Sequence, residues 1–413
     1  MNIQLLLIFV LIFGIVPNLG FFTFSSFFLL TVFGILAWII LRNPSHVKED
    51  SSFSEWGVLV IYLVSATYYG GYYQNTLSQL IGQVVFFSFC TYIFTQLYKN
   101  REIPSYMFII FFLFLSLLTI FGSPNPTVDT FVILREAPQK FLQGQNPYNS
   151  VYSQVYANIK PDYFNYLPFS IIYFIPFVYF FGDPRYGLVV AMIGTYIVIN
   201  MLQKKSSSQK YLFSSLFLFA PRSFYMIEHA YLDTLIFFIF VLALFFSEKS
   251  KDKLFSLVIS CFFLIKQNII IVLPLFIKKI FKRKITMLFF ILPFISVVFF
   301  FFWNPQAFIK MTITGYQPDL LLKTVPLQNK IVVPNVIYQL FHPSNSHMQV
   351  ITTMSALVAF FIAIVILLNN KLKTNRKIIL ILFFGYFFSY HAYFNSYYLV
   401  LLFLLFDFVL SKK

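Results

Sequence analysis

The stretch PSYMFIIFFLFLSLLTIFG, residues 104–122, contains nineteen residues and no charged side chain. A helix of about 20 apolar residues crosses roughly 30 Å of hydrocarbon, so this run is long enough to span a bilayer. Similar apolar runs recur along the chain without the alternation that the strands of a barrel show. Backbone groups in lipid need internal partners, which favours helices. The sequence therefore predicts an all-α, polytopic integral membrane protein with about 12–14 transmembrane helices.

The composition of the 413-residue chain supports this prediction, because 59% of its residues are hydrophobic and only 11% are charged. A net charge of +16 would suit a nucleic-acid partner, but the charges are not gathered in one patch. Lys and Arg lie in short clusters between apolar runs: Lys204–Lys210, Lys249–Lys253, Lys278–Lys284 and Lys371–Lys377. This pattern is typical of cytoplasmic loops. We expect a lipid bilayer and no nucleic acid as partner.

The N-terminal stretch is interpreted as a membrane helix that stays in the protein. The first 41 residues contain no Lys or Arg, which favours a retained helix over a cleaved signal peptide. Both termini are expected in the cytoplasm. Cys90 and Cys261 lie inside apolar runs and are interpreted as packing residues.

Placing the basic clusters on the cytoplasmic side orders the runs into crossings. Two hairpins come first, and residues 104–122 then lead to an outer loop at 123–165, the longest hydrophilic loop of the chain. The predicted spans outside two irregular regions are 3–17, 22–41, 56–73, 77–97, 104–122, 187–202, 285–303, 349–368, 378–393 and 397–410. Three units result: N-terminal hairpins at 1–103, a catalytic module at 104–330, and C-terminal helices at 331–413.

Two apolar regions do not fit as simple crossings. Residues 166–181 contain Pro168 and Pro176, which suit a re-entrant or interfacial helix. Residues 254–277 carry Lys266 in the middle, where a straight span would bury its charge at a cost of about 2.5–3.5 kcal/mol. We therefore predict two half-helices that meet at residues 266–268, because broken helices are tolerated where they line protein or water.

The outer loop begins with Asp129, which is either a helix cap or a base at the mouth of a cavity. Residues 130–143 resemble a short amphipathic helix lying on the membrane, ended by Gly144 and open to interruption at Pro138. Arg135, Glu136 and Tyr148 also belong to this loop. These three are candidate substrate-binding residues.

Further polar residues lie at a junction between two apolar runs, in PRSFYMIEHAYLDTLIFF. Ionisable groups near a membrane are costly, which favours a functional role. Glu228 and Asp233 are therefore candidate catalytic residues, and His229 is a candidate substrate-binding residue. The alternative is a structural ion pair between Glu228 and Arg222. Arg222 itself is a candidate for binding a phosphate.

Lys266 and Gln267 are the remaining candidates for substrate binding. A Lys acts on a phosphate as a point charge, whereas the alternative is a side chain that reaches the membrane surface. No spacing of His or Cys residues indicates a structural metal site.

The segment DTFVILREAPQKFLQGQNPY, residues 129–148, resembles the first outer loop of the GT-C superfamily of membrane glycosyltransferases. The following segments, in this order, strengthen the resemblance: FNYLPFSIIYFIPF, GDPRYGL, PRSFYMIEHAYLDTL, LIKQNIIIVLPLF and FFWNPQAF. It covers residues 125–318 and is closest to mannosyltransferase-like members that use polyprenyl-phosphate sugars. A membrane-parallel helix in the outer loop is part of the implied fold.

The resemblance implies an inverting sugar transfer in which Asp129 is the base and Asp233, or less directly Glu228, is a second acidic residue. The implied partners are a polyprenyl-phosphate-linked sugar and a glycan, lipid or protein acceptor, in the plasma membrane of a prokaryote that builds its cell envelope. Asp129 is followed by Thr130, so the acidic doublet of some members is missing and dependence on a divalent cation stays open.

Two other functions fit the same composition. A transporter or flippase of a lipid-linked saccharide would need charges along a path through both leaflets, and often internal repeats. The sequence shows no clear repeat and its conspicuous polar residues fall on one predicted side. A glycan polymerase or ligase is the second alternative, although its large outer loop usually comes later in the chain.

Overall fold

The computed structural model describes residues 55–155, 164–203, 208–282, 284–314, 332–389, 392 and 394–411, with five more residues between 31 and 39. Every regular element in this part is helical. The elements of the N-terminal half are α3 (Glu55–Thr67), α4 (Thr76–Tyr98), α5 (Ser105–Gly122), α6 (Asp129–Leu142), η1 (Pro147–Asn149), α7 (Pro168–Phe181), α8 (Arg185–Leu202), α9 (Ser208–Ser214), α10 (Leu216–Phe219) and α11 (Ser223–Glu228).

The second half is helical as well, with several short 3₁₀ segments between the α-helices. Its elements are α12 (Asp233–Glu248), α13 (Asp252–Phe263), η2 (Gln267–Leu275), α14 (Ile277–Ile280), α15 (Lys284–Ile291), η3 (Leu292–Phe294), α16 (Ile295–Trp303), α17 (Pro305–Thr312), α19 (Val333–Phe341), α20 (Asn345–Leu368), α21 (Thr374–Phe388), η6 (Phe394–Ser396) and α22 (Tyr397–Ser411). The all-α prediction is confirmed for the described residues.

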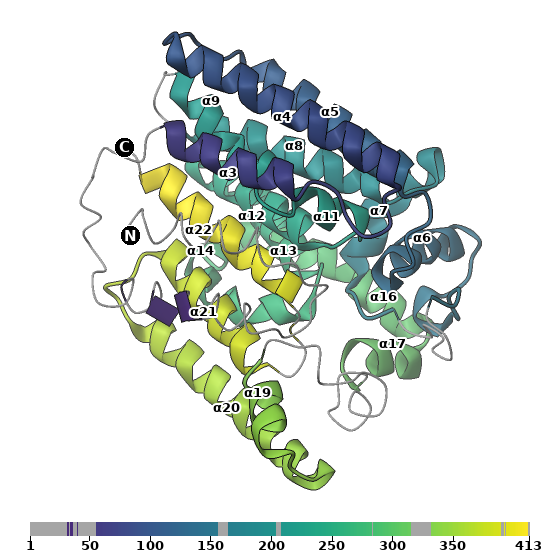
Figure 1. Cartoon of the computed structure of the whole chain (residues 1–413). Helices are drawn as coiled ribbons and strands as arrows, with labels where there is room; N and C mark the ends of the chain where they lie inside the picture. The colour runs from purple at the N-terminus through teal and green to yellow at the C-terminus, as the bar shows by residue number, and fades with distance from the viewer. Residues whose placement is uncertain are drawn as a thin grey trace.

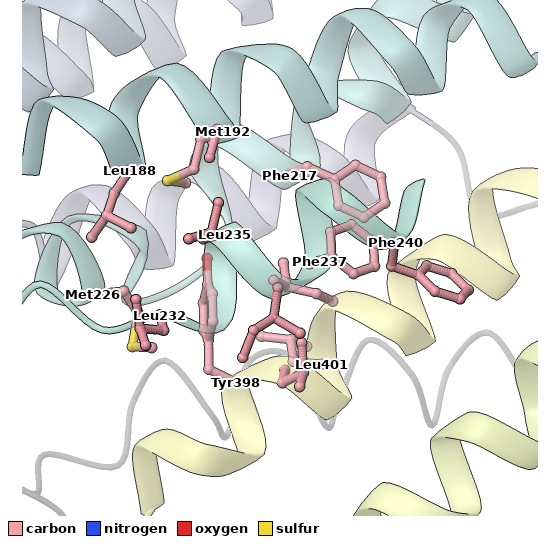
Figure 2. Close-up of a cluster of buried hydrophobic side chains, with 14 of the residues drawn as sticks. Leu188, Met192, Phe217, Met226, Leu232, Leu235, Phe237, Phe240, Tyr398 and Leu401 are labelled. Carbon is pink, nitrogen blue, oxygen red and sulfur yellow. The ribbon is translucent and has the colours of Figure 1, made fainter. Parts of the chain in front are cut away.

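Helix α12 lies at the centre of the core and packs against α8, α13 and α22. Its side chains meet those of α8, α10, α11 and α22 in one apolar cluster, where Phe237 stacks on Phe217 and Tyr398 and Leu401 close the other side (Figure 2). Helix α22 is buried along almost its whole length. The chain thus joins its middle and its C-terminal helix in a single core.

Five helical segments are long enough and apolar enough to cross a membrane: Thr76–Tyr98, Ser105–Gly122, Arg185–Leu202, Lys284–Trp303 and Ser346–Leu368. They coincide with five of the predicted spans. Helix α20 shows what such a helix presents to its surroundings, because a row of large apolar side chains stays exposed along one face: Val350, Met354, Leu357, Phe361 and Val365. An apolar face of this length is unfavourable in water and suits hydrocarbon.

Several helices end at the same side of the bundle, and α6 lies there beside α7 and α16 (Figure 1). The backbone N–H of Asn75, just before α4, donates to the carbonyl of Gly122 at the end of α5, at 2.9 Å. Several other helix termini lie at this side: the ends of α3, α5 and α13, and the starts of α4, α8 and α12. Residues distant in sequence therefore meet at one end of the bundle.

The break predicted near Lys266 is confirmed, since α13 ends at Phe263 and the 3₁₀ segment η2 starts at Gln267. The predicted span 56–73 was too long, because α3 ends at Thr67 and the next residues form a turn with Gly70 at φ +100°. Helix α6 is continuous through Pro138, so this proline does not divide it. Gly144 follows α6 with φ +75°, as expected of a residue that ends a helix.

Some predictions fall outside the described residues. These are the spans 3–17 and 22–41, apart from five residues of the second. The middle of the loop 123–165, at residues 156–163, also lies outside them.

Candidate functional site

The first turn of α6 is attached to the junction that follows α11. The hydroxyl of Thr130 donates to the backbone carbonyl of His229 at 2.7 Å. Asp129 is the first residue of α6 and is half-buried; the N-cap is Val128, which provides no side-chain bond. One oxygen of Asp129 accepts from the amide of Thr130 at 2.8 Å. The cap interpretation of Asp129 was therefore wrong in its position, and its carboxylate lies at the start of the helix beside the junction.

The carboxylate of Glu228 is fully buried and is held by the backbone of the turn after α3. It accepts from the amide of Tyr72 at 2.7 Å and from that of Tyr73 at 3.1 Å. Burial raises the pKa of Glu228 from 4.5 to about 7, and these amide donors limit the rise. A Cβ on Gly71 would lie 1.7 Å from a carboxylate oxygen, so this close approach requires glycine.

His229 is a neutral imidazole within a group of tyrosines. Burial lowers its pKa to about 3, so its Nδ1 donates to the carbonyl of Tyr225, 3.0 Å away. The 3.3 Å distance from Nδ1 to a Glu228 oxygen is then a contact with a neutral ring and not an ion pair. The ring stacks on Tyr231 with centroids 5.5 Å apart. His229 thus serves here as an aromatic packing residue.

Arg222 is the N-cap of α11 and has a left-handed backbone, φ 70°, which is uncommon for a residue other than glycine. Its guanidinium lies 5.5 Å above the ring centre of Tyr225. The positive charge of Arg222 therefore acts on the tyrosines next to His229. The contacts that hold the Glu228 carboxylate come from the Tyr72 and Tyr73 amides, so no pair with Arg222 is needed to explain its burial.

A second polar group lies where α12 starts and α13 ends. Asp233 is 4% exposed, and within the described part of the chain its Oδ1 has no hydrogen-bond partner. The charge of the half-buried Lys266 acts on this carboxylate. The charge of this carboxylate also acts on Tyr386 of α21 and Tyr398 of α22. The arrangement leaves a buried acceptor beside a cation, which a ligand with hydroxyl groups can satisfy.

The far end of the outer loop is fixed to the Lys266 segment. Residues at the start of α7 pair with the residues after α13, since Leu167 N–H donates to Ile265 and Phe169 N–H to Leu264, both at 3.1 Å. The side-chain amide of Gln267 donates to the carbonyls of Asn165 and Thr312 at 3.0 and 3.2 Å. Gln267 therefore links two backbone segments, and both hydrogen bonds that its amide nitrogen donates go to the protein itself.

The other loop residues lie farther along α6. Arg135 donates to the side chain of Asn125 at 3.1 Å, and Glu136 accepts from the amide of Ser153 at 3.1 Å. Both line an open hollow of about 330 Å³ together with Gln139, Lys140, Gln143 and Gly182. Tyr148 is buried, and its hydroxyl donates to the carbonyl of Tyr166 at 2.9 Å, which identifies it as a packing residue.

Arg185 is a polar residue of this end that the sequence did not single out. It is fully buried, pairs with Asp183 at 2.6 Å and donates to the carbonyl of Ser123 at 2.8 Å. Its guanidinium also lies 4.8 Å above the ring centre of Phe131. Arg185 therefore connects α5, α6 and α8. The turn GDPRY was the only sequence feature that could have drawn attention to Arg185, but an exposed turn can have the same sequence.

The structure thus brings Asp129, Glu228 and His229 together in one group and Asp233 with Lys266 in another, and joins the two groups through residues 229–233. Arg135 and Glu136 lie apart on the outer face of α6. Within the described residues, no three or more His, Cys, Asp or Glu side chains are placed to hold a metal ion. Comparison with known proteins found no matching family model, no matching curated protein and no matching solved structure.

Proposed function

We propose that this chain is a multi-pass membrane glycosyltransferase of the GT-C type, which moves a sugar from a polyprenyl phosphate to an acceptor. The observation that carries the proposal is the position of the outer loop. Its start is attached to the Glu228 junction through Thr130, and its end to the Lys266 segment through Leu167. Asp129 thus shares one end of the bundle with Asp233 and Lys266, as an enzyme with a single outward site requires.

The proposed setting is the plasma membrane of a prokaryote, with about 12–14 crossings and both termini in the cytoplasm. The five apolar helices and the exposed apolar face of α20 support membrane insertion. The site end of the bundle is then the extracytoplasmic end. A lipid-linked donor suits such a site, because its tail can lie between helices while its head group enters from the membrane.

In the proposed reaction, Asp129 takes the proton of an acceptor hydroxyl. A hydroxyl is a weak nucleophile near pH 7, and a base within about 3 Å removes its proton as the bond forms. The acceptor oxygen bonds to the anomeric carbon, the bond from that carbon to the phosphate oxygen breaks, and the electron pair leaves with the lipid phosphate. Attack from the face opposite the phosphate inverts the configuration at this carbon.

Lys266 is the proposed partner of the leaving phosphate. Its fixed positive charge stabilises the negative charge that grows on the phosphate as the bond breaks. The negative charge of Asp233 attracts this ammonium, and the Asp233 oxygen that has no partner among the described residues accepts from a hydroxyl of the sugar. Arg222 packs over Tyr225, next to the stack of His229 on Tyr231.

The test uses the purified full chain in nanodiscs with synthetic polyprenyl-phosphate hexoses and a set of glycan, lipid and peptide acceptors. The measured product is the free polyprenyl phosphate released with the glycosylated acceptor. Asp129→Asn should lower the turnover at least about 100-fold, because a general base contributes that much or more. Asp252→Asn, at the start of α13, is the matched control and should keep full turnover.

Two results would overturn the proposal. The first is an Asp129→Asn protein that turns over like the wild type. The second is a wild-type protein in liposomes that moves the lipid-linked sugar across the bilayer without transferring it, which would favour the flippase alternative.

A further inference from the structure

The turn between α3 and α4 forms a strap over the junction that follows α11. We define this strap as residues 70–74. Its amides at Tyr72 and Tyr73 donate to the Glu228 carboxylate at 2.7 and 3.1 Å. Consecutive backbone N–H groups of this kind form a concave anion site, which the carboxylate fills here.

The strap is matched to Glu228 in shape as well as in charge. Gly70 has φ +100°, a conformation that other residues rarely adopt, and its Cα lies close to the side chain of Gln74. The Cα of Gly71 almost touches the carboxylate, because a Cβ there would lie 1.7 Å from Oε2. Any side chain at this position would displace either the strap or Glu228.

The strap contacts a residue on one side of Asp129, and the residue after Glu228 contacts one on the other side. The hydroxyl of Tyr73 donates to the carbonyl of Thr127 at 2.9 Å. On the other side, Thr130 donates to the carbonyl of His229, the residue next to Glu228, at 2.7 Å. Asp129 is thus flanked by two hydrogen bonds: one comes from the strap that Glu228 binds, and the other goes to the residue that follows Glu228.

Glu228 cannot itself reach a substrate, because its side chain is fully buried and its oxygens face backbone amides. We propose that Glu228 is a positioning residue that orients the Asp129 carboxylate through the strap and Thr127, and that it does not contact the reacting atoms. This role rests on the proposed function of Asp129. It replaces the catalytic role that the sequence suggested for Glu228.

The test measures hydrogen exchange of the peptides covering 70–74 and 125–131 in the full chain in nanodiscs. Glu228→Gln turns one acceptor oxygen into a donor that faces an amide, so both segments should exchange about tenfold faster. Glu248→Gln, at the exposed end of α12, is the matched control and should change neither segment.

Gly71→Ala disturbs the contact between the strap and Glu228 from the side of the strap. It should speed exchange in the same two segments, 70–74 and 125–131. Gly385→Ala is its control, because nothing lies within 4 Å of a Cβ at that position. Adding Glu228→Asp to Gly71→Ala withdraws the carboxylate by one methylene and makes room for the new methyl group. The double variant should therefore recover slower exchange than Gly71→Ala alone.

Tyr73→Phe is the mildest variant, since it removes only the bond to Thr127. It should speed exchange at 125–131 and leave 70–74 unchanged. In the transfer assay, it should lower kcat by up to about 100-fold at an unchanged KM for the donor, because a base displaced by about 1 Å loses that much.

The outcomes separate the two proposals. If Glu228→Gln loosens 70–74 while 125–131 keeps wild-type exchange, the positioning role is wrong. If the variants couple the two segments as expected but the wild-type protein transfers no sugar, the positional link stands and the proposed enzyme activity fails.

Discussion

The two polar groups at the site end of the bundle differ in how completely their hydrogen bonds are satisfied. At the Glu228 junction, the carboxylate, the amides of Tyr72 and Tyr73 and the carbonyl of His229 all have partners. At the start of α12, the Asp233 carboxylate is almost as deeply buried, yet one of its oxygens has no partner among the described residues. A buried polar group that is satisfied stabilises a fold, whereas an unsatisfied one costs stability and indicates a place for a ligand.

The largest expected effect comes from Arg185, another buried side chain at this end whose hydrogen bonds are satisfied. Arg185→Met removes the cation and leaves the Asp183 carboxylate and the carbonyl of Ser123 without their partner. The free energy of unfolding should fall by about 3–5 kcal/mol, since loss of one member of a buried pair leaves the other uncompensated. Unfolding in mixed micelles at increasing denaturing detergent measures it. Arg135→Met is the control, and an equal loss there would show that the burial of Arg185 does not matter.

The second prediction concerns the pH dependence of the Glu228 junction. The pKa of Glu228 is about 7 in the fold, above its ordinary value of 4.5, because burial disfavours the charged form. The folded protein therefore binds this proton more tightly than the unfolded chain. Its contribution to stability is complete below about pH 4.5 and is lost as the pH rises through about 7, a change on the order of 3 kcal/mol.

Glu228→Gln removes the titrating group, so the stability of this variant should vary less over the same pH range. Detergent unfolding at several pH values gives the comparison with the wild type. A variant that keeps the full pH dependence would show that another group is responsible.

The third prediction tests the unsatisfied group. Asp233→Asn should change the free energy of unfolding by no more than about 1 kcal/mol, because the carboxylate oxygen that it replaces has no bond to lose. The same variant should bind a polyprenyl-phosphate hexose roughly tenfold more weakly, while its binding of bare polyprenyl phosphate stays unchanged. A large loss of stability would mean that Asp233 is a structural residue like Glu228.

The smallest expected effect is that of Tyr386→Phe. The hydroxyl of Tyr386 accepts one bond from the amide of Asn268 at 3.3 Å. Its removal should cost about 0.5–1.5 kcal/mol, the usual contribution of one such bond. Thermal unfolding of the detergent-solubilised protein measures the difference, and no shift would place Tyr386 outside the group around Asp233.

The sequence predicted the helices of this molecule better than the tertiary contacts between them. Five apolar runs were long enough to be recognised as helices, and Lys266 marked the break before η2, because a charge in the middle of an apolar run is costly. The strap was missed. Gly70 and Gly71 lay inside an apolar run that reads as one span, and the carboxylate that orders them is more than 150 residues away.

The candidate site shows the same division. Asp129, Glu228, Asp233 and Lys266 could be selected as polar residues in apolar surroundings, but their partners depend on tertiary contacts. Nothing local in the sequence indicates that Gln267 and Tyr148 hold backbone carbonyls, or that Arg185 is buried. Hydrogen bonding, and not burial, distinguishes Glu228, which accepts from backbone amides, from Asp233, one of whose oxygens has no partner among the described residues.

The almost complete burial of α22 has a consequence for how the chain is made. Helices α10 and α12 present apolar surfaces that α22 covers (Figure 2), yet α22 follows α12 by well over a hundred residues. During synthesis these surfaces of the middle helices therefore stay uncovered until the ribosome has made α22. The central core is thus completed only after α22 has been made, and a ribosome that stalls before residue 397 leaves a chain whose exposed apolar surfaces attract quality-control proteases.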